Sequence, residues 1–109
     1  VFYNDFTKTP WANELLVDFA EDALVNEQLG ADDVPDILSV SFSANDILGH
    51  YFGPNSQEVL QMTVETDRAV ARLLDLVDKR VGLENTLIFF TADHGVVPIP
   101  EYSQARKLG

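Results

Sequence analysis

Two short motifs hold the only two histidines of this sequence, and each motif sets an aspartate close to its histidine. The first motif is Asp46-Ile-Leu-Gly-His50 and the second is Asp93-His94-Gly95. In a helical turn, side chains four residues apart lie on one face about 5–6 Å apart at Cβ, so Asp46 and His50 can reach one cation. Asp93 and His94 are adjacent, so they converge only where the backbone departs from regular structure, which Gly95 permits.

Carboxylate and imidazole groups are metal ligands, and the chain has no cysteine, so any metal must be held by Asp, Glu and His. Zinc suits this donor set best, manganese and iron are alternatives, and the nitrogen ligands disfavour calcium. Each pair taken alone has an ordinary structural explanation, because aspartates often cap helical turns and buried histidines are usually satisfied by hydrogen bonds. The choice therefore depends on whether the fold brings the two pairs together.

Helical periodicity predicts two long helices. Thr9 suits the N-cap of the first, with Pro10 at its first helical position, and Gly30 closes it. A cap at 55–56 begins the second helix, and Gly82 ends it. Apolar residues recur at helical spacing in both. They are Leu15, Leu16, Phe19, Ala20, Ala23 and Leu24 in the first helix, and Val59, Met62, Thr66, Ala69, Val70, Leu73, Leu74 and Val77 in the second.

Two short runs rich in β-branched and apolar residues predict strands at about 36–43 and 86–91. The second run, TLIFFT, is nearly all apolar, which is typical of a strand buried on both faces of a parallel sheet. Residues 44–55 predict a loop with one helical turn at about 46–51. The order helix-strand-helix-strand predicts an α/β fold, a fragment of a parallel, doubly wound sheet.

In such a sheet the carboxyl ends of parallel strands lie at one edge, where ligands gather. Each motif follows one of the predicted strands directly, so we expect Asp46 and Asp93 at the same edge. Two Asp/His pairs at one edge favour a metal site over two unrelated helix caps.

The segments SFSANDILGHYFGPNS and TLIFFTADHG resemble the metal-binding core of the alkaline phosphatase superfamily. The branch they resemble contains the nucleotide pyrophosphatases/phosphodiesterases and the phosphate-irrepressible alkaline phosphatases. The resemblance covers about residues 36–96, and the helical stretch from Thr9 is similar too. It implies an alkaline phosphatase-like, metal-dependent hydrolase of phosphate esters, with two zinc ions and manganese as the alternative. The same resemblance implies a periplasmic or extracellular location for the parent protein.

Within this resemblance, the two motifs are ligands of different ions. Asp46 and His50 are implied ligands of one zinc, completed by a histidine expected downstream of Gly109. Asp93 and His94 are implied ligands of the other zinc, completed by an aspartate and a nucleophilic Thr or Ser expected upstream. None of Ser39, Ser41, Ser43 or Thr91 matches the family's nucleophile position. We therefore assign no catalytic residue here and expect the chain alone to be inactive.

The composition limits the size of the unit and the classes of partner that it can bind. The 109 residues suit one compact unit, 46% of them are apolar, and both ends are interpreted as cuts, so we expect residues 1–109 to be one piece of a larger catalytic domain. A formal charge of −11 argues against nucleic-acid polymers, whose phosphates require Lys and Arg. No apolar run approaches the about 20 residues of a membrane-spanning helix. The implied partner is a phosphate-ester substrate, and apolar faces left by the cuts predict self-association.

Two other interpretations stay open. A cofactor-independent phosphoglycerate mutase has similar motifs and uses manganese, although Phe52-Gly53-Pro54 and Val96-Val97-Pro98 fit the phosphatase branch better. A non-catalytic α/β interaction module would use both Asp/His pairs as caps. Zinc titration separates the non-catalytic module from the two metalloenzymes.

Overall fold

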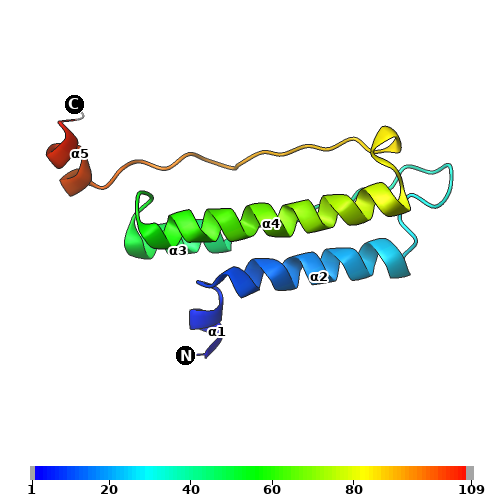
Figure 1. The fold of residues 1–109 in the computed structure, drawn as a ribbon, viewed down its shortest axis with the longest axis horizontal. Coiled ribbons are helices and arrows are strands. Elements are labelled where there is room, and N and C mark those ends of the chain that lie inside the picture. The colour runs from blue at the N-terminus through cyan, green and yellow to red at the C-terminus, as the bar shows by residue number, and fades with distance from the viewer. Residues whose placement is uncertain (1, 108–109) are drawn as a thin grey trace.

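The computed structural model describes residues 2–107, and every regular element in that range is helical (Figure 1). Two long helices pack side by side, and a shorter helix packs against both. In chain order the elements are α1 (Phe2–Phe6), α2 (Pro10–Asn26), α3 (Ala44–Phe52), α4 (Gln57–Arg80), the 3-10 turn η1 (Leu83–Asn85) and α5 (Pro100–Arg106).

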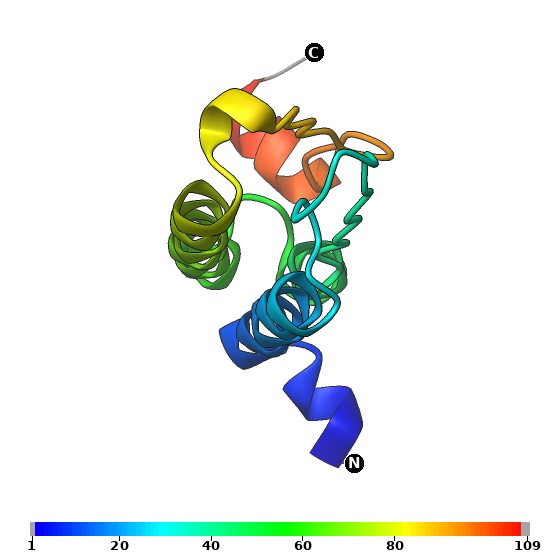
Figure 2. The ribbon, with the colours of Figure 1, turned by 90° about the vertical axis from the view of Figure 1, so that its right-hand side faces the viewer.

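The chain runs back and forth along the long axis of an elongated molecule of 55 × 34 × 19 Å. Helices α2 and α4 run in one direction, and α3 runs the opposite way (Figure 1). Two stretches without regular structure, 35–43 and 86–99, return from the far ends of α2 and α4, and both follow the direction of α3. Viewed along the helices in Figure 2, both stretches lie to one side of the helical layer.

The predicted sheet is absent from residues 2–107, so the prediction of an α/β helix-strand-helix-strand fold is wrong for the described chain. Residues 36–43 and 86–91 form no strand. A strand requires a ladder of backbone hydrogen bonds to a neighbour, and within the described range no such bond joins these two stretches. Their β-branched and apolar composition suits a pleated, half-buried surface, but composition supplies no partner.

The core lies between α2, α3 and α4. It contains Val17, Ala20, Leu24, Ala44, Leu48, Met62 and Ala69. The predicted face of α4 is correct at its centre, where Met62 and Ala69 are buried. The predicted face of α2 is only partly correct, because α2 buries the row at 13, 17, 20 and 24 and leaves Leu15, Leu16 and Phe19 exposed. The contact with α4 thus lies further around the helix than apolarity alone indicated.

The predicted helix starts hold, with one difference in chemistry. Ser56 caps α4, and its Oγ accepts a hydrogen bond from the backbone N–H of Val59 at 3.2 Å. Thr9 occupies the N-cap position of α2 with Pro10 at the helix start. The Thr9 hydroxyl, however, donates back to the carbonyl oxygen of Phe6 at 2.7 Å. The start of α2 is therefore tied to the end of α1.

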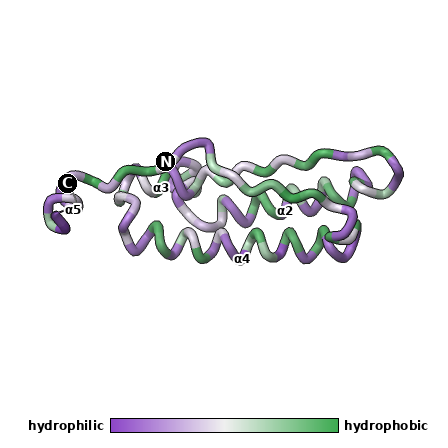
Figure 3. The backbone as a smooth tube through the Cα atoms, turned by 90° about the horizontal axis from the view of Figure 1, so that it is seen from above, coloured by the Kyte–Doolittle hydropathy of each residue, from purple (hydrophilic) through white to green (hydrophobic). Residues whose placement is uncertain are grey.

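Apolar residues also occur along the two extended stretches, parts of which are coloured as hydrophobic in Figure 3. Their side chains are largely open to solvent, with Ile37 92% and Phe90 84% exposed. No helix among the described residues is long and apolar enough to cross a bilayer.

Candidate metal centre

Helix α3 carries the first motif on its outer face. Asp46 lies in its first turn and His50 in its last. Ala44 and Leu48 are buried against Met62 of α4 and fix the inner face. Residues two positions further along lie about 200° around a helix, so Asp46 and His50 point away from that core. Their side chains are 44% and 75% exposed.

The Asp46 and His50 side chains meet across one helical turn. Nε2 of His50 lies 3.4 Å from Oδ2 of Asp46. Two ligand atoms bonded to a tetrahedral zinc at about 2.0–2.2 Å are separated by about 3.4 Å. The observed separation equals the one that a shared zinc requires. The helix is also longer than the predicted turn at 46–51, so both side chains stand on regular backbone.

The second motif lies on the stretch between η1 and α5. Nε2 of His94 lies 3.7 Å from Oδ1 of Asp46 and 3.8 Å from Oδ2 of Asp93. The two oxygens of Asp46 therefore face two different histidines, one from each motif. The approach of Asp93 to its neighbour does not use a left-handed glycine, because Gly95 is not among the residues with positive φ.

The His94 ring is oriented by its own backbone. Its Nδ1 lies 2.9 Å from the carbonyl oxygen of Gly95, and its backbone N–H donates to Oδ1 of Asp93 at 3.1 Å. A carbonyl oxygen only accepts, so Nδ1 carries the proton in this contact. In the neutral ring, Nε2 then has a free lone pair, and it faces the carboxylates of Asp46 and Asp93.

The pKa of His94 is raised above its ordinary value. The largest cause is the hydrogen bond to the Gly95 carbonyl, followed by the negative charges of Asp93 and Asp46. Each of these interactions favours the protonated ring. The same negative field that holds a proton on His94 favours a divalent cation at this position.

The four side chains form pairs rather than a closed site. Asp46 is shared between two of the pairs, and the separations are 3.4, 3.7 and 3.8 Å. Among residues 2–107, no three Asp, Glu, His or Cys groups cluster closely enough to hold one ion. Catalytic zinc sites normally have three protein ligands and structural sites four. The described residues thus supply two ligands around each candidate position.

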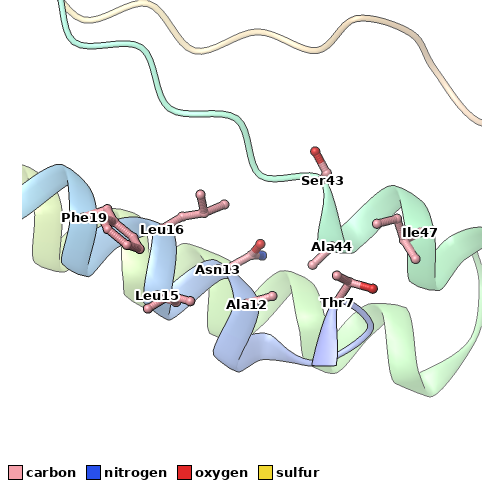
Figure 4. A pocket seen from close by; sticks show the side chains of 9 residues that line it. All are labelled: Thr7, Ala12, Asn13, Leu15, Leu16, Phe19, Ser43, Ala44 and Ile47. Carbon is pink, nitrogen blue, oxygen red and sulfur yellow. The ribbon is translucent and has the colours of Figure 1, made fainter. Parts of the chain in front are cut away.

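A pocket of about 240 Å³ lies elsewhere, between α2 and the start of α3 (Figure 4). Apolar side chains dominate its wall, among them Leu15, Leu16 and Phe19, and none of the four Asp and His side chains lines it. The four Asp and His side chains are 44–90% exposed, so the candidate metal centre is an open surface beside α3. One buried amide, Asn13, also lines this pocket.

Sequence reasoning missed the polar residues that hold α3 in place. Asn45 directly precedes Asp46 and bonds to side chains of α2 and α4. One signal was present in the sequence: Asn13 stands at core spacing from Val17, where an apolar residue is the usual occupant. The connections themselves depend on how the helices pack.

A sequence model of the family described as type I phosphodiesterase/nucleotide pyrophosphatase matches residues 3–109. This chain is a member of that family. The assignment to the alkaline phosphatase superfamily is thereby confirmed, and it accords with the motifs around Asp46 and Asp93.

Several proteins similar to this family member are bacterial alkaline phosphatases. Alkaline phosphatase PafA of Elizabethkingia meningoseptica is 40% identical over 100 residues, which is 92% of this chain and 18% of that protein. Alkaline phosphatase PhoV of Synechococcus elongatus is 35% identical over 107 residues, 98% of this chain and 20% of that protein. The chain therefore spans about a fifth of the length of these relatives.

The fold of this family member is also similar to a solved structure. The crystal structure of wild-type alkaline phosphatase PafA matches with a TM-score of 0.89 at 39% identity, over 94% of this chain and 20% of that one. The helical layer and the path of both extended stretches thus follow a known protein.

Proposed function

We propose that this chain supplies part of the two-metal site of a phosphate-ester hydrolase. Asp46 and His50 bind one divalent ion, and Asp93 and His94 bind the other, with zinc preferred and manganese as the alternative. One observation carries the proposal: the two carboxylate oxygens of Asp46 lie 3.4 and 3.7 Å from Nε2 atoms of histidines in separate motifs. Membership of a phosphodiesterase family supports the same chemistry.

The donor set fits zinc by type, spacing and charge. Carboxylate oxygen and imidazole nitrogen are both zinc ligands, and 3.4 Å is the separation expected of two such atoms on a tetrahedral ion. Among the described residues, the ion pairs of Asp46 and Asp93 are formed with histidine, and none is formed with Lys or Arg. Their negative charge is therefore not offset by a permanent cation of this chain, which favours binding of a divalent one.

The residues of this chain position the two ions and offset part of their charge. When bound, the two ions supply electrophilic stabilisation of the charge that develops on a transferring phosphoryl group. Asp46 and Asp93 would offset part of the positive charge of the ions, and His50 and His94 would fix the direction from which each ion is bound. The contact between His94 Nδ1 and the Gly95 carbonyl holds the ring with Nε2 outward, as is usual for metal-bound histidine.

Zinc titration of the purified chain by calorimetry tests the proposal. We expect saturable binding that weakens by about tenfold or more in Asp46→Ala, because both histidines lose their facing carboxylate. Asp75→Ala is the matched control, because Asp75 is an exposed acid in the last third of α4. The C-terminal end of α4 lies away from α3 (Figure 1). Absence of saturable binding, or an equal loss in Asp75→Ala, would contradict the proposed site.

Turnover provides the second test. In a longer protein that contains this chain, His50→Ala or Asp93→Ala lowers hydrolysis by about a thousandfold or more, since phosphoryl transfer depends on positioning and charge stabilisation. The chain alone, which lacks an assigned nucleophile, gives no turnover with added zinc. Assays with one phosphate monoester and one phosphodiester, run on both proteins, measure this. Metal-dependent turnover by the chain alone would show that the nucleophile lies within it.

A further inference from the structure

Four polar side chains join the three main helices directly behind Asp46, and we call them the amide–hydroxyl cluster. They are Asn13 on α2, Asn45 on α3, and Thr63 and Thr66 on α4. Nδ2 of Asn13 donates to Oδ1 of Asn45 at 3.1 Å and to Oγ1 of Thr66 at 2.8 Å. The Thr66 hydroxyl lies 2.9 Å from the same Asn45 oxygen, and Nδ2 of Asn45 donates to Thr63 at 3.3 Å.

The cluster sits at the boundary of the core, where hydrogen bonds fix positions. Asn13 is 1% exposed, and its Nδ2 bonds to Asn45 and Thr66 and approaches Sδ of Met62 at 3.8 Å. Its Oδ1 is buried without a hydrogen-bond partner among residues 2–107, so the Nδ2 bonds are the ones that hold the amide. A buried amide that loses its partners costs more than the bond itself contributes, because the group can no longer be solvated. Figure 4 shows Asn13 directed from α2 toward the start of α3. Such directional contacts set one arrangement of the helices, whereas apolar contacts tolerate sliding.

Helix α3 has few other means of fixing its rotation. It is nine residues long, and its N-cap residue Ser43 makes no side-chain capping bond. Only Ala44 and Leu48 anchor it in the core. Lys8 also approaches the exposed Tyr51 ring in the last turn, at 4.1 Å from its centroid. The Asn45 amide, by contrast, bonds to both neighbouring helices and therefore sets how α3 is turned about its own axis. Asp46 is the next residue, so its direction follows that setting.

The rotation of α3 matters for a metal ligand. A side-chain atom lies roughly 5–6 Å from the helix axis, so a turn of about 10° moves the Asp46 carboxylate by about 1 Å. Metal–ligand bonds tolerate deviations of only about 0.2 Å. The 3.4 Å contact with His50 within the helix survives such a turn, but the 3.7 Å contact with His94 on another segment does not.

We propose that the amide–hydroxyl cluster is a positioning device that sets the rotation of α3 so that the Asp46 carboxylate faces both histidines. The inference rests on the proposed metal site and adds residues that touch no ligand atom of that site. Asn13, Asn45 and Thr66 act through the helix, and they are positioning residues.

The test replaces Thr66, because it lies on a different helix from both motifs. Thr66→Val keeps the shape and removes the hydroxyl that bonds Asn45 and accepts from Asn13. Thr66→Ser restores that hydroxyl. We expect zinc affinity, measured by calorimetry, to fall about tenfold in Thr66→Val and to return to within about twofold in Thr66→Ser. The absorption spectrum of bound Co²⁺, which reports ligand geometry, should change in the valine variant only.

Arg72→Gln is the matched control for simple destabilisation. Arg72 also joins α4 to α2, through Asp18 at 2.5 Å and Glu21 at 2.9 Å, but it forms no hydrogen bond or ion pair with α3 among the described residues. Its loss should lower the urea midpoint of unfolding and leave zinc affinity and the Co²⁺ spectrum unchanged. A metal-free measurement completes the test: backbone amides 47–50 of α3 should exchange about tenfold faster in Thr66→Val and not in Arg72→Gln.

The outcomes are distinct. If the unaltered chain binds zinc and Thr66→Val binds it equally well, the positioning role is overturned while the metal site stands. An equal loss in Arg72→Gln would also overturn it, because zinc affinity would then follow stability alone. If the unaltered chain binds no zinc, the proposed function itself fails. A loss in Thr66→Val that serine restores, with Arg72→Gln unaffected, supports the inference.

Discussion

The helical layer and the two extended stretches differ in how they are held. In the layer, α2, α3 and α4 bury a shared core around Val17 and Met62, both completely shielded from solvent. The stretches at 35–43 and 86–99 carry equally apolar side chains, yet Phe89 and Phe90 are more than 80% exposed. Backbone groups of the helices bond within each helix, whereas those of the stretches depend on a neighbour that residues 2–107 do not provide.

This difference divides the candidate metal centre into two unlike halves. Asp46 and His50 stand on a packed helix whose rotation is set by Asn45. Asp93 and His94 stand on a stretch whose hydrogen bonds near the motif join neighbouring residues, and the contact of His94 with Asp46 at 3.7 Å links it to α3. One half of the site is thus supported by tertiary packing, and the other by local hydrogen bonds. Metal binding should order the second half more than the first.

The largest effect should separate the two regions by stability. We expect Met62→Ala to lower the free energy of unfolding by about 2–5 kcal/mol, because it opens a cavity in the helical core. Phe90→Ala should change it by less than about 0.5 kcal/mol, since its ring is already exposed. Urea titration followed by circular dichroism measures both. A comparable loss in Phe90→Ala would show that the second stretch is packed in solution.

Backbone amide exchange should show the same division at a smaller scale. Amides in the middle of α4 are closed by helical hydrogen bonds and should exchange at least about a hundredfold more slowly than those at 87–92. Mass spectrometry of exchanged, digested protein resolves the two segments. Equal protection of 87–92 and α4 would mean that the stretch finds a hydrogen-bonding partner.

The exposed stretches also predict association between copies of the chain. Contiguous apolar side chains and unpaired backbone groups favour contacts with a second molecule. We expect an association constant that falls about tenfold in Phe90→Lys, measured by analytical ultracentrifugation over a concentration series. Trp11→Lys is the control for a general gain of positive charge, because Trp11 is an exposed residue in the first turn of α2. A monomer at all concentrations would contradict this expectation.

The smallest effect concerns His94. Its Gly95 hydrogen bond and the charges of Asp93 and Asp46 raise its pKa, so the metal-free ring should titrate above the ordinary range. Asp93→Asn should lower that pKa, as followed by proton NMR. The associated stabilisation is present below the ordinary histidine pKa and is lost as the pH rises through the raised one. An unchanged titration in Asp93→Asn would show that the carboxylate stays apart from the ring in solution.

Much of the helical layer could be predicted from spacing and caps. Ser56 caps α4 as the sequence indicated, and the apolar row through Met62 and Ala69 is buried. The buried face of α2 differs from the predicted one, because Leu16 and Phe19 are as apolar as the residues that α4 covers. Periodicity locates a helix, but the packing partner selects which of two apolar faces is buried.

The candidate site shows the same division. The motifs predicted that Asp46 and His50 would meet across a turn, and they lie 3.4 Å apart because helical geometry is local. The family resemblance implied that each motif binds its own ion, and in the structure His94 lies as close to Asp46 as to Asp93. That sharing depends on the path of residues 86–99 over α3, which no local pattern encodes.

By itself the sequence determined the ligand chemistry and the family, since those depend on residue types at short spacing and on motifs such as ADHG. The β-branched residues in 36–43 and 86–91 disfavour a helix, and neither stretch is helical, but the strands predicted there are absent from the structure. Only the tertiary structure decided that they form no sheet, that Asp46 faces both histidines, and that Asn13, Asn45 and Thr66 stand behind it. Hydrogen bonds between distant segments need a partner in space, and a one-dimensional pattern specifies the donor and acceptor without specifying where they meet.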